Sequence, residues 1–342
     1  MIRKKIKVLI VDDSLVFREF LARSLAADPG IEVVATAVDA YDARDKIIEF
    51  EPDVMTLDVE MPRMSGVEFL QRLLPQYPLP VVMISAISDK VFEAMAAGAV
   101  DFVVKPDPKG GRAPAVVINE LKTKIKVASI AKVAQCKKPA LPAQPAAKPV
   151  QAGSSDRIIA LGASTGGTEA IFSILKKLPA DMPGMVIVQH MPPVFTRLFA
   201  ERMNALTLLD VKEAQSGDRL GRGRVLIAPG DKHMRLVKVS GGFGVECAAG
   251  DKVSGHCPSV DVLFESVARE AGKNAIGVLL TGMGQDGAKG LLKMRQGGAR
   301  TIGQDEQTSV VYGMPKVAWE LGAVEKQGAL SAIPQLIYSF LP

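Results

Sequence analysis

The sequence predicts an α/β protein built from two doubly wound parallel-sheet domains. Apolar segments of strand length alternate with amphipathic helical segments along most of the chain, and one proline-rich stretch interrupts this alternation. A chain of 342 residues is also longer than one hydrophobic core commonly serves. Because 48% of the residues are hydrophobic, the composition suffices to fill two cores.

The interruption, CKKPALPAQPAAKPVQAGSS, covers residues 136–155. Its prolines disrupt any regular helix and favour an extended spacer. We therefore expect a first domain at residues 1–135, a linker at 136–155 and a second domain at 156–342.

The first domain contains five strand-like segments, each followed by a helical pattern. The strand-like segments are KVLIV, EVVAT, DVMTLD, PVVMIS and DFVVK. The helical patterns run from Ser14 to about Ala27, through AYDARDKIIEF, SGVEFLQRLL and DKVFEAMAAG, and from about Pro114 onward. Five such units predict a flavodoxin-like (βα)5 domain, a parallel sheet covered by helices on both faces.

The second domain repeats the alternation with more glycine. RIIALG, GMVIVQ, RVLIAP and AIGVLLTG are strand-like, and helical patterns cover 168–178, 193–205, 259–271 and 286–296. We expect a second, Rossmann-like α/β domain here.

Charge and apolar patterning argue against nucleic-acid and membrane partners. The net charge is +5, and the basic excess lies mainly in residues 106–156, in the last helix of the first domain and the linker. No apolar run approaches the roughly 18 residues of a membrane span, and no signal-peptide pattern is present. The three cysteines are too scattered for a disulfide framework. We expect a reduced, cytoplasmic monomer with neither nucleic-acid binding nor membrane insertion.

Polar residues follow the strands of the first domain at one sheet edge. Asp12 and Asp13 end the first strand, Asp58 the third, Ser85 the fourth and Lys105 the fifth. Each one alone is a common helix-capping or turn residue. Together, carboxylates at one edge favour a hard cation such as Mg²⁺, and the lysine and hydroxyl suit an incoming phosphoryl group. The chemistry this indicates is an aspartyl phosphate.

Four segments of this domain, VLIVDDSLVFR, DVMTLDVEMPRMSGVEFL, VVMISA and DFVVKP, resemble those of two-component receiver domains. The resemblance implies that Asp58 accepts phosphate from a chemotaxis histidine kinase. It also implies that Asp12, Asp13, Asp58 and the backbone of Glu60 hold Mg²⁺, that Lys105 contacts the phosphate, and that Ser85 and Phe102 are switch residues. Ser65 departs from the family pattern, in which Asp is common there.

In the second domain, the segment IIALGASTGGTEAI reads as a strand, a small-residue turn and a helix start. Its glycines fit neither a dinucleotide loop nor a P-loop, although an anion at the helix N-terminus stays possible. GASTG does fit the Gly-x-Ser-x-Gly turn that exposes a nucleophilic serine, here Ser164. Helix capping by Ser164 is the competing interpretation.

A serine nucleophile needs a base and an orienting carboxylate. The three histidines are His190, at the end of a strand and favoured by position, His233, a real competitor, and His256, in a loop before a helix. The candidate carboxylates are Asp286, after the strand AIGVLLTG, and its rivals Asp231 and Asp305. Spacing alone does not choose among the carboxylates.

Several segments, among them ALGASTGGTEAI, VIVQHM, APGDKHM and GVLLTGMGQDGAKGL, resemble the catalytic domain of the CheB family of chemotaxis receptor methylesterases. The resemblance implies that Ser164, His190 and Asp286 are catalytic, and that Thr165 and Met283 supply oxyanion donors or support. It implies no cofactor at this site. It implies a substrate too: methylated glutamates of chemotaxis receptors, with glutamine deamidation as a second activity.

A receiver joined to a hydrolase suggests control by phosphorylation. We hypothesise that the unphosphorylated receiver occludes the active site and that phosphorylation of Asp58 relieves this. The alternatives are a DNA-binding output domain, a protein-interaction module and a nucleotide-binding domain. The first predicts a compact basic helix-turn-helix, whereas the second half of this chain is large and rich in glycine.

Overall fold

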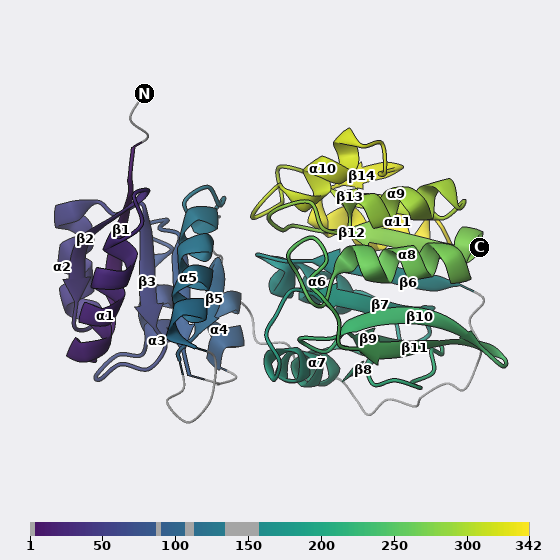
Figure 1. Cartoon of the computed structure of the whole chain (residues 1–342), viewed down its shortest axis with the longest axis horizontal. Coiled ribbons are helices and arrows are strands. Elements are labelled where there is room, and N and C mark those ends of the chain that lie inside the picture. The colour runs from purple at the N-terminus through teal and green to yellow at the C-terminus, as the bar shows by residue number, and fades with distance from the viewer. Residues whose placement is uncertain (1–3, 87–89, 107–112, 134–156, 342) are drawn as a thin grey trace. The chain divides into compact units, whose positions relative to one another are not determined.

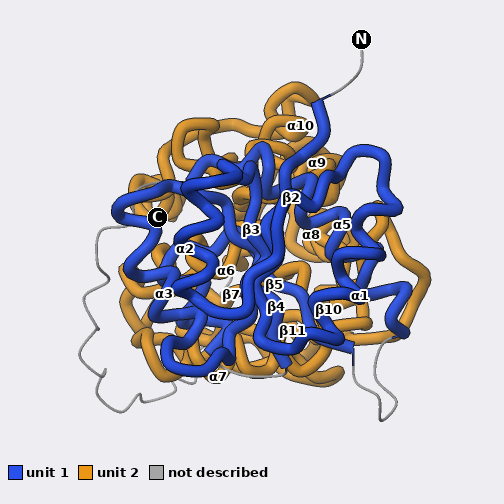
Figure 2. Tube along the Cα trace, turned by 90° about the vertical axis from the view of Figure 1, so that its left-hand side faces the viewer, with its two compact units in different colours: residues 1–140 blue, residues 141–342 orange. Residues whose placement is uncertain are grey.

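The computed structural model describes residues 4–86, 90–106, 113–133 and 157–341, which Figure 1 shows as ribbons. The chain divides into two compact units, Met1–Ala140 and Leu141–Pro342 (Figure 2). The expected linker, 136–155, lies outside the described residues.

The first unit holds a five-stranded, fully parallel sheet in the order β2-β1-β3-β4-β5. The strands are β1 (Ile6–Val11), β2 (Ile31–Ala37), β3 (Val54–Asp58), β4 (Val81–Ser85) and β5 (Asp101–Val104). The helices are α1 (Leu15–Ala26), α2 (Ala40–Phe50), α3 (Gly66–Leu73), α4 (Lys90–Ala96) and α5 (Pro114–Ala128). The predicted (βα)5 fold is confirmed.

Local sequence explains where three of these helices begin. The Ser14 hydroxyl accepts the Phe17 N–H at the start of α1, and the Asp39 carboxylate accepts two amide N–H groups at the start of α2. Ser65, the departure from the family pattern, caps α3 in a reciprocal capping box with Glu68. The free backbone N–H groups at the start of α3 are therefore hydrogen-bonded by side chains of the same turn.

The second unit holds a seven-stranded parallel sheet in the order β14-β13-β12-β6-β7-β9-β8. Its strands are β6 (Ile158–Ala163), β7 (Gly184–Gln189), β8 (Asp210–Glu213), β9 (Arg224–Ile227), β12 (Ala275–Leu279), β13 (Arg300–Gln304) and β14 (Lys326–Gly328). Its α-helices are α6 (Gly167–Leu175), α7 (Phe195–Leu206), α8 (Val260–Glu270), α9 (Ala288–Gln296), α10 (Met314–Glu320) and α11 (Ile333–Tyr338). Short 3₁₀ turns cover Gly272–Asn274 and Leu330–Ala332.

An antiparallel hairpin departs from the expected alternation of strands and helices. It consists of β10 (His233–Val239) and β11 (Gly242–Ala248), a separate two-stranded sheet that packs against α8 (Figure 1). Its period-two alternation buries Leu236 and Val245 on the core face. Sequence analysis identified neither this hairpin nor the short strands β8, β13 and β14.

The order of the parallel strands creates a switch point beside β6. The chain runs from β6 to β7 on one side and later returns through β12 on the other side. In open parallel sheets, ligand-binding crevices form at the carboxyl ends of the strands at such a point. Ser164 follows β6, His190 follows β7, and Asp286 lies in the turn between β12 and α9.

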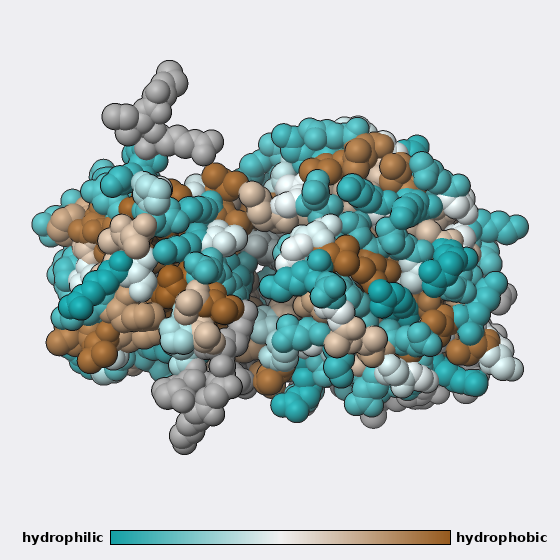
Figure 3. All heavy atoms as spheres, viewed as in Figure 1, coloured by the Kyte–Doolittle hydropathy of each residue, from teal (hydrophilic) through white to brown (hydrophobic). Residues whose placement is uncertain are grey.

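In the view of Figure 3, hydrophilic residues cover most of both units, with apolar ones scattered among them. Among the described residues, no helix has the length and apolar character needed to cross a bilayer.

Candidate active site

Asp286 is held as a buried carboxylate at the N-terminus of α8. One oxygen, Oδ1, accepts the Ser259 hydroxyl at 2.7 Å and the Asp261 N–H at 3.0 Å. The other, Oδ2, accepts the Val260 N–H at 2.7 Å and lies 2.8 Å from Nε2 of His190. These donors, His190 foremost, outweigh the effect of burial and hold the pKa of Asp286 below its usual range.

The hydrogen bond with Asp286 sets the orientation of the His190 ring. Because Nε2 faces the carboxylate, Nε2 carries the proton and Nδ1 is left with a lone pair. Nδ1 is buried and has no hydrogen-bond partner among the described residues. Nδ1 is therefore the atom of His190 that is available as a base.

Ser164 lies in the turn between β6 and α6, and its N–H donates to the Thr281 carbonyl at 3.0 Å. No described residue forms a hydrogen bond with its hydroxyl. Gly166 makes the turn possible: its φ is +76°, and an added Cβ would lie 2.7 Å from the Val310 side chain. Gly282, in the turn after β12, lies against the serine: a Cβ there would lie 2.7 Å from Ser164 Cβ and 2.3 Å from Met314 Sδ.

The predicted oxyanion residues lie on the two segments that meet at Ser164. Thr165 is buried, and its carbonyl accepts the Thr281 hydroxyl at 3.0 Å. Met283 is 44% exposed in the turn after β12, two residues beyond Thr281. Hydrogen bonds from Thr281 to Ser164 and Thr165 therefore join the two segments that carry Thr165 and Met283.

The competing residues are engaged elsewhere. His233 is buried, accepts the Ser259 N–H with Nδ1 at 3.2 Å, and places Nε2 2.8 Å from the Asp251 carbonyl. Asp305 accepts the N–H and hydroxyl of Thr308. Asp231 forms no hydrogen bond with any histidine in the described part of the chain. Of the candidates, the structure joins only His190 and Asp286 into a pair.

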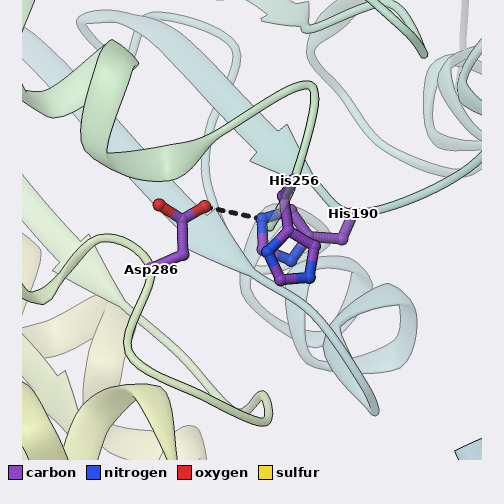
Figure 4. A group of neighbouring side chains, drawn as sticks. All are labelled: His190, His256 and Asp286. Carbon is purple, nitrogen blue, oxygen red and sulfur yellow. Dashed lines mark hydrogen bonds and ion pairs between the residues drawn. The ribbon is translucent and has the colours of Figure 1, made fainter. Parts of the chain in front are cut away.

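His256 lies against this pair (Figure 4). Its ring stacks on that of His190, with centroids 3.7 Å apart and planes within 6° of parallel. Donor atoms of His190, His256 and Asp286 lie within 4.8 Å of one another. The lone pairs of two parallel rings lie in parallel planes and do not converge on one ion, so this group is poorly suited to tetrahedral metal binding.

Two residues that were not predicted from the sequence, Gln189 and Ser259, support the site. The Gln189 amide donates to the Ser164 carbonyl at 3.0 Å and to the His190 carbonyl at 3.4 Å, linking the two loops. Ser259 caps α8 and also donates to Asp286. The position of Gln189 beside His190, and the Ser-x-x start of a helix at Ser259, were the only signals available.

In the first unit, the acidic residues gather at the edge of the sheet as predicted. Carboxylate oxygens of Asp12, Asp13 and Asp58 lie within 4.8 Å of one another. The Lys105 ammonium lies 2.8 Å from Asp12 Oδ2 and 2.7 Å from Asp58 Oδ2, while the Glu60 N–H donates to Asp58 Oδ1 at 3.3 Å. Burial, with the Asp12 charge as a smaller contribution, raises the pKa of Asp58 to about 6.

This arrangement fits a divalent cation. One ammonium contacts two of the three carboxylates, so the cluster keeps excess negative charge, and oxygen donors are what Mg²⁺ prefers. Asp12, Asp13, Asp58 and the Glu60 backbone are the groups that we expect would hold it.

The two predicted switch residues are both buried. The Ser85 hydroxyl has no hydrogen-bond partner among the described residues, and it ends β4 next to β3, which carries Asp58. Phe102 is 3% exposed, with the Lys124 ammonium 5.1 Å from its ring centroid.

Comparison with known proteins identifies the class and then the family. Residues 8–111 match the family model of the response regulator receiver domain, and residues 159–337 match that of the CheB methylesterase. The protein is therefore a response regulator with an enzymatic second domain. The chain belongs to the CheB methylesterase family, and the predicted receiver, methylesterase domain and enzyme class are confirmed.

Relatives support this over nearly the whole chain. A protein-glutamate methylesterase/protein-glutamine glutaminase of Syntrophomonas wolfei is 59% identical, covering 99% of this chain and 98% of the relative. The enzyme of the same name from Salmonella typhimurium is 48% identical over 97% and 95%. The crystal structure of the Thermotoga maritima CheB methylesterase catalytic domain is 37% identical, with a TM-score of 0.53 over 55% of this chain and 100% of that domain.

Proposed function

We propose that this protein hydrolyses methyl esters of glutamate side chains on chemotaxis receptors and deamidates receptor glutamines. The names of its relatives support both reactions. The observation that carries the proposal is the buried Asp286–His190 pair, which leaves Nδ1 of His190 as a base on the loop tied to that of Ser164. The enzyme acts in the cytoplasm, as a monomer.

The first half-reaction forms an acyl-enzyme. Ser164 Oγ attacks the ester carbonyl carbon while Nδ1 of His190 takes the hydroxyl proton. Asp286 stabilises the imidazolium that results. When the tetrahedral intermediate collapses, the C–O bond to the methyl group's oxygen breaks, and His190 returns the proton to release methanol.

The second half-reaction restores the serine. A water molecule loses a proton to Nδ1 of His190 and attacks the acyl carbon, which releases the glutamate carboxyl group and Ser164. With a glutamine substrate, ammonia leaves in place of methanol in the first half-reaction, and the second half-reaction is the same. We propose that backbone N–H groups near Thr165 and Met283 donate hydrogen bonds to the oxyanion of the tetrahedral intermediates. Each such donor contributes roughly 10²–10³-fold to the rate.

The receiver supplies the control. Asp58 accepts a phosphoryl group from a histidine kinase, and Lys105 contacts it. Asp12, Asp13, Asp58 and the Glu60 backbone would hold Mg²⁺, which would neutralise charge on the phosphoryl group. Ser85 and Phe102 respond to the modified Asp58. The unphosphorylated receiver restricts access to Ser164, and phosphorylation relieves this restriction.

The test is methanol release from membranes that carry methylated receptors, measured with and without a small-molecule phosphodonor. Ser164→Ala removes the nucleophile and should abolish release. Ser173→Ala is the matched control, because the Ser173 hydroxyl only donates to the Ala170 carbonyl within α6. Release at the normal rate by Ser164→Ala would exclude the mechanism.

Control by the receiver has its own test. A fragment of about residues 150–342 should be active without a phosphodonor. If it is only as active as the unphosphorylated full chain, the receiver does not restrict access. Acylation of Ser164 by a serine-reactive probe distinguishes an enzyme from an interaction module.

A further inference from the structure

His256 is placed against the catalytic pair by its own loop. Val253 and His256 exchange two backbone hydrogen bonds of 3.0 Å, and the two residues between them, Ser254 and Gly255, have φ values of +52° and +85°. This is the geometry of a tight two-residue turn with both central residues left-handed. Nδ1 of His256 lies 2.9 Å from the Ser254 carbonyl, which fixes the ring.

The same loop continues into the anchor of Asp286. Three residues after His256, Ser259 donates to Asp286 and caps α8. One short segment, residues 253–259, therefore holds both the ring that stacks on His190 and the carboxylate that bonds to its Nε2. The imidazole of His190 is confined by Asp286 at its Nε2 edge and by His256 on its face.

The stacked ring is neutral at physiological pH. Burial, and next the neighbouring His190, lower the pKa of His256 to about 4. Asp286 opposes this effect, Lys252 adds to it, and Asp261 lies beside Asp286 at the start of α8. A neutral aromatic ring offers an electron-rich face, which attracts a cation at a centroid distance below about 6 Å.

We infer that His256 is a positioning residue that holds the ring plane of His190 and stabilises its protonated form through stacking. The inference rests on the proposed function, in which His190 gains a proton from Ser164. Since the imidazolium exists in the transition states and not in the resting enzyme, the stack lowers the barrier and not the affinity for substrate. His256 neither takes nor gives a proton.

Two variants of the full chain separate this role from simple packing. His256→Phe keeps an aromatic face that cannot titrate, and His256→Leu fills similar space without one. Methanol release from methylated receptor membranes is measured with a phosphodonor across about pH 5.5–9. We expect Phe to retain kcat within about threefold and Leu to lose kcat roughly tenfold, or about 1.4 kcal/mol, with KM unchanged.

The pH profile supplies a readout that packing would not change. Because the stack favours the protonated His190 ring, the acid limb of kcat/KM in His256→Leu should move about one unit to lower pH. The limb in His256→Phe should stay in place. Equal kcat and equal acid limbs for Phe and Leu, whether high or low, would overturn the inference, as would a loss confined to KM.

Two further arms keep the outcome readable. If the Leu variant fails to fold, judged by thermal unfolding, His256→Asn replaces it, because its amide keeps a donor for the Ser254 carbonyl but no aromatic face. The Asn variant should show the same loss as Leu. Ser164→Ala is measured in parallel: its activity at the wild-type rate would refute the proposed mechanism, whereas its inactivity beside equal Phe and Leu variants refutes only the role of His256.

Discussion

Each unit carries an aspartate to which we assign a functional role, at the carboxyl edge of a parallel sheet, and the surroundings of the two carboxylates differ in opposite directions. Asp58 receives one backbone N–H at 3.3 Å and shares a single lysine with Asp12, so burial raises its pKa to about 6. Asp286 receives three short hydrogen bonds from the start of α8 besides that of His190, and its pKa is lowered.

The difference matches two kinds of chemistry. A carboxylate that is to bind a cation and accept a phosphoryl group needs oxygens that neutral donors have not already saturated. A carboxylate that is to orient a histidine needs the reverse, since a saturated anion neither moves nor takes the proton. The same residue type at equivalent ends of strands is specialised by the donors around it.

At both edges a glycine lies close against the residue that we propose to react. A Cβ at Gly66 would lie 1.9 Å from the Asp58 carbonyl oxygen, and one at Gly282 would lie 2.7 Å from Ser164 Cβ. Neither glycine has a positive φ, so the requirement is space alone.

The largest effect is expected from neutralising the saturated carboxylate. Asp286→Asn should lower kcat by about 10⁴-fold, because an amide does not stabilise the imidazolium and permits the wrong tautomer of His190. Methanol release measures this. Asp210→Asn, which breaks an ion pair with Arg224 at the start of β8, is the control and should keep full activity. An active Asp286→Asn enzyme would remove the proposed contrast between the two edges.

Crowding the catalytic edge should come next. In Gly282→Ala the new methyl group would lie 2.3 Å from Met314 Sδ and 2.7 Å from Ser164 Cβ, so both side chains must move. Displacement of a reacting group by about 1 Å costs on the order of 10²-fold in kcat. In Gly297→Ala, at the end of α9, the nearest atom to the new Cβ lies at 3.4 Å, so this variant should match wild type. Wild-type kcat in Gly282→Ala would show that Ser164 tolerates displacement.

The neutral His256 ring should make the second unit sensitive to acid. An unfolded histidine titrates near pH 6.5, while burial lowers the pKa of His256 to about 4 in the folded state. Between these values the unfolded chain binds more protons, so the free energy of unfolding falls as the pH decreases through this window, by at most about 3 kcal/mol. His256→Phe should lack this component.

Urea unfolding followed by fluorescence measures this stability, because the single tryptophan, Trp319, lies in α10 of the second unit. Above about pH 7 the difference between wild type and His256→Phe should be constant. Identical dependence on pH in both proteins would mean that His256 is not held neutral.

The smallest effect is expected at Asp58, the carboxylate that receives fewer hydrogen bonds. Asp58→Asn should abolish the response to a phosphodonor, which we expect to be about tenfold, or 1.4 kcal/mol, while leaving the unstimulated rate unchanged. Asp53→Asn is the control and should respond normally. Asp53 lies just before β3, at the opposite end of the strand from Asp58, and its carboxylate accepts the Lys7 N–H. A normal phosphodonor response in Asp58→Asn would place the phosphorylated residue elsewhere.

Much of the fold follows from periodicity in the sequence. Continuous apolar runs such as IKVLIV and VVMIS are buried along their whole length or nearly so, as expected for parallel strands between two helical layers. The hairpin β10–β11 escaped prediction because its alternation is short and interrupted by glycines, and because only packing on α8 tells which of its faces is buried.

By itself, the sequence determined which polar residues lie at the carboxyl ends of the strands, because the end of an apolar run marks the end of a strand. Ser164, His190, Asp58 and Lys105 were all located in this way. The choice among three histidines was different. His233 and His190 both follow apolar segments, and only the strand order β12-β6-β7 places His190 across β6 from Asp286, while His233 opens a separate hairpin.

Tertiary structure alone decided which atom of His190 is the base and what covers its ring. Ring orientation depends on a carboxylate 96 positions away, and the stack depends on a turn at Ser254 and Gly255. Such contacts join segments that are distant along the chain, and no local periodicity encodes them. They form because packing of α8 on β6 and β12 brings the loops together at one sheet edge.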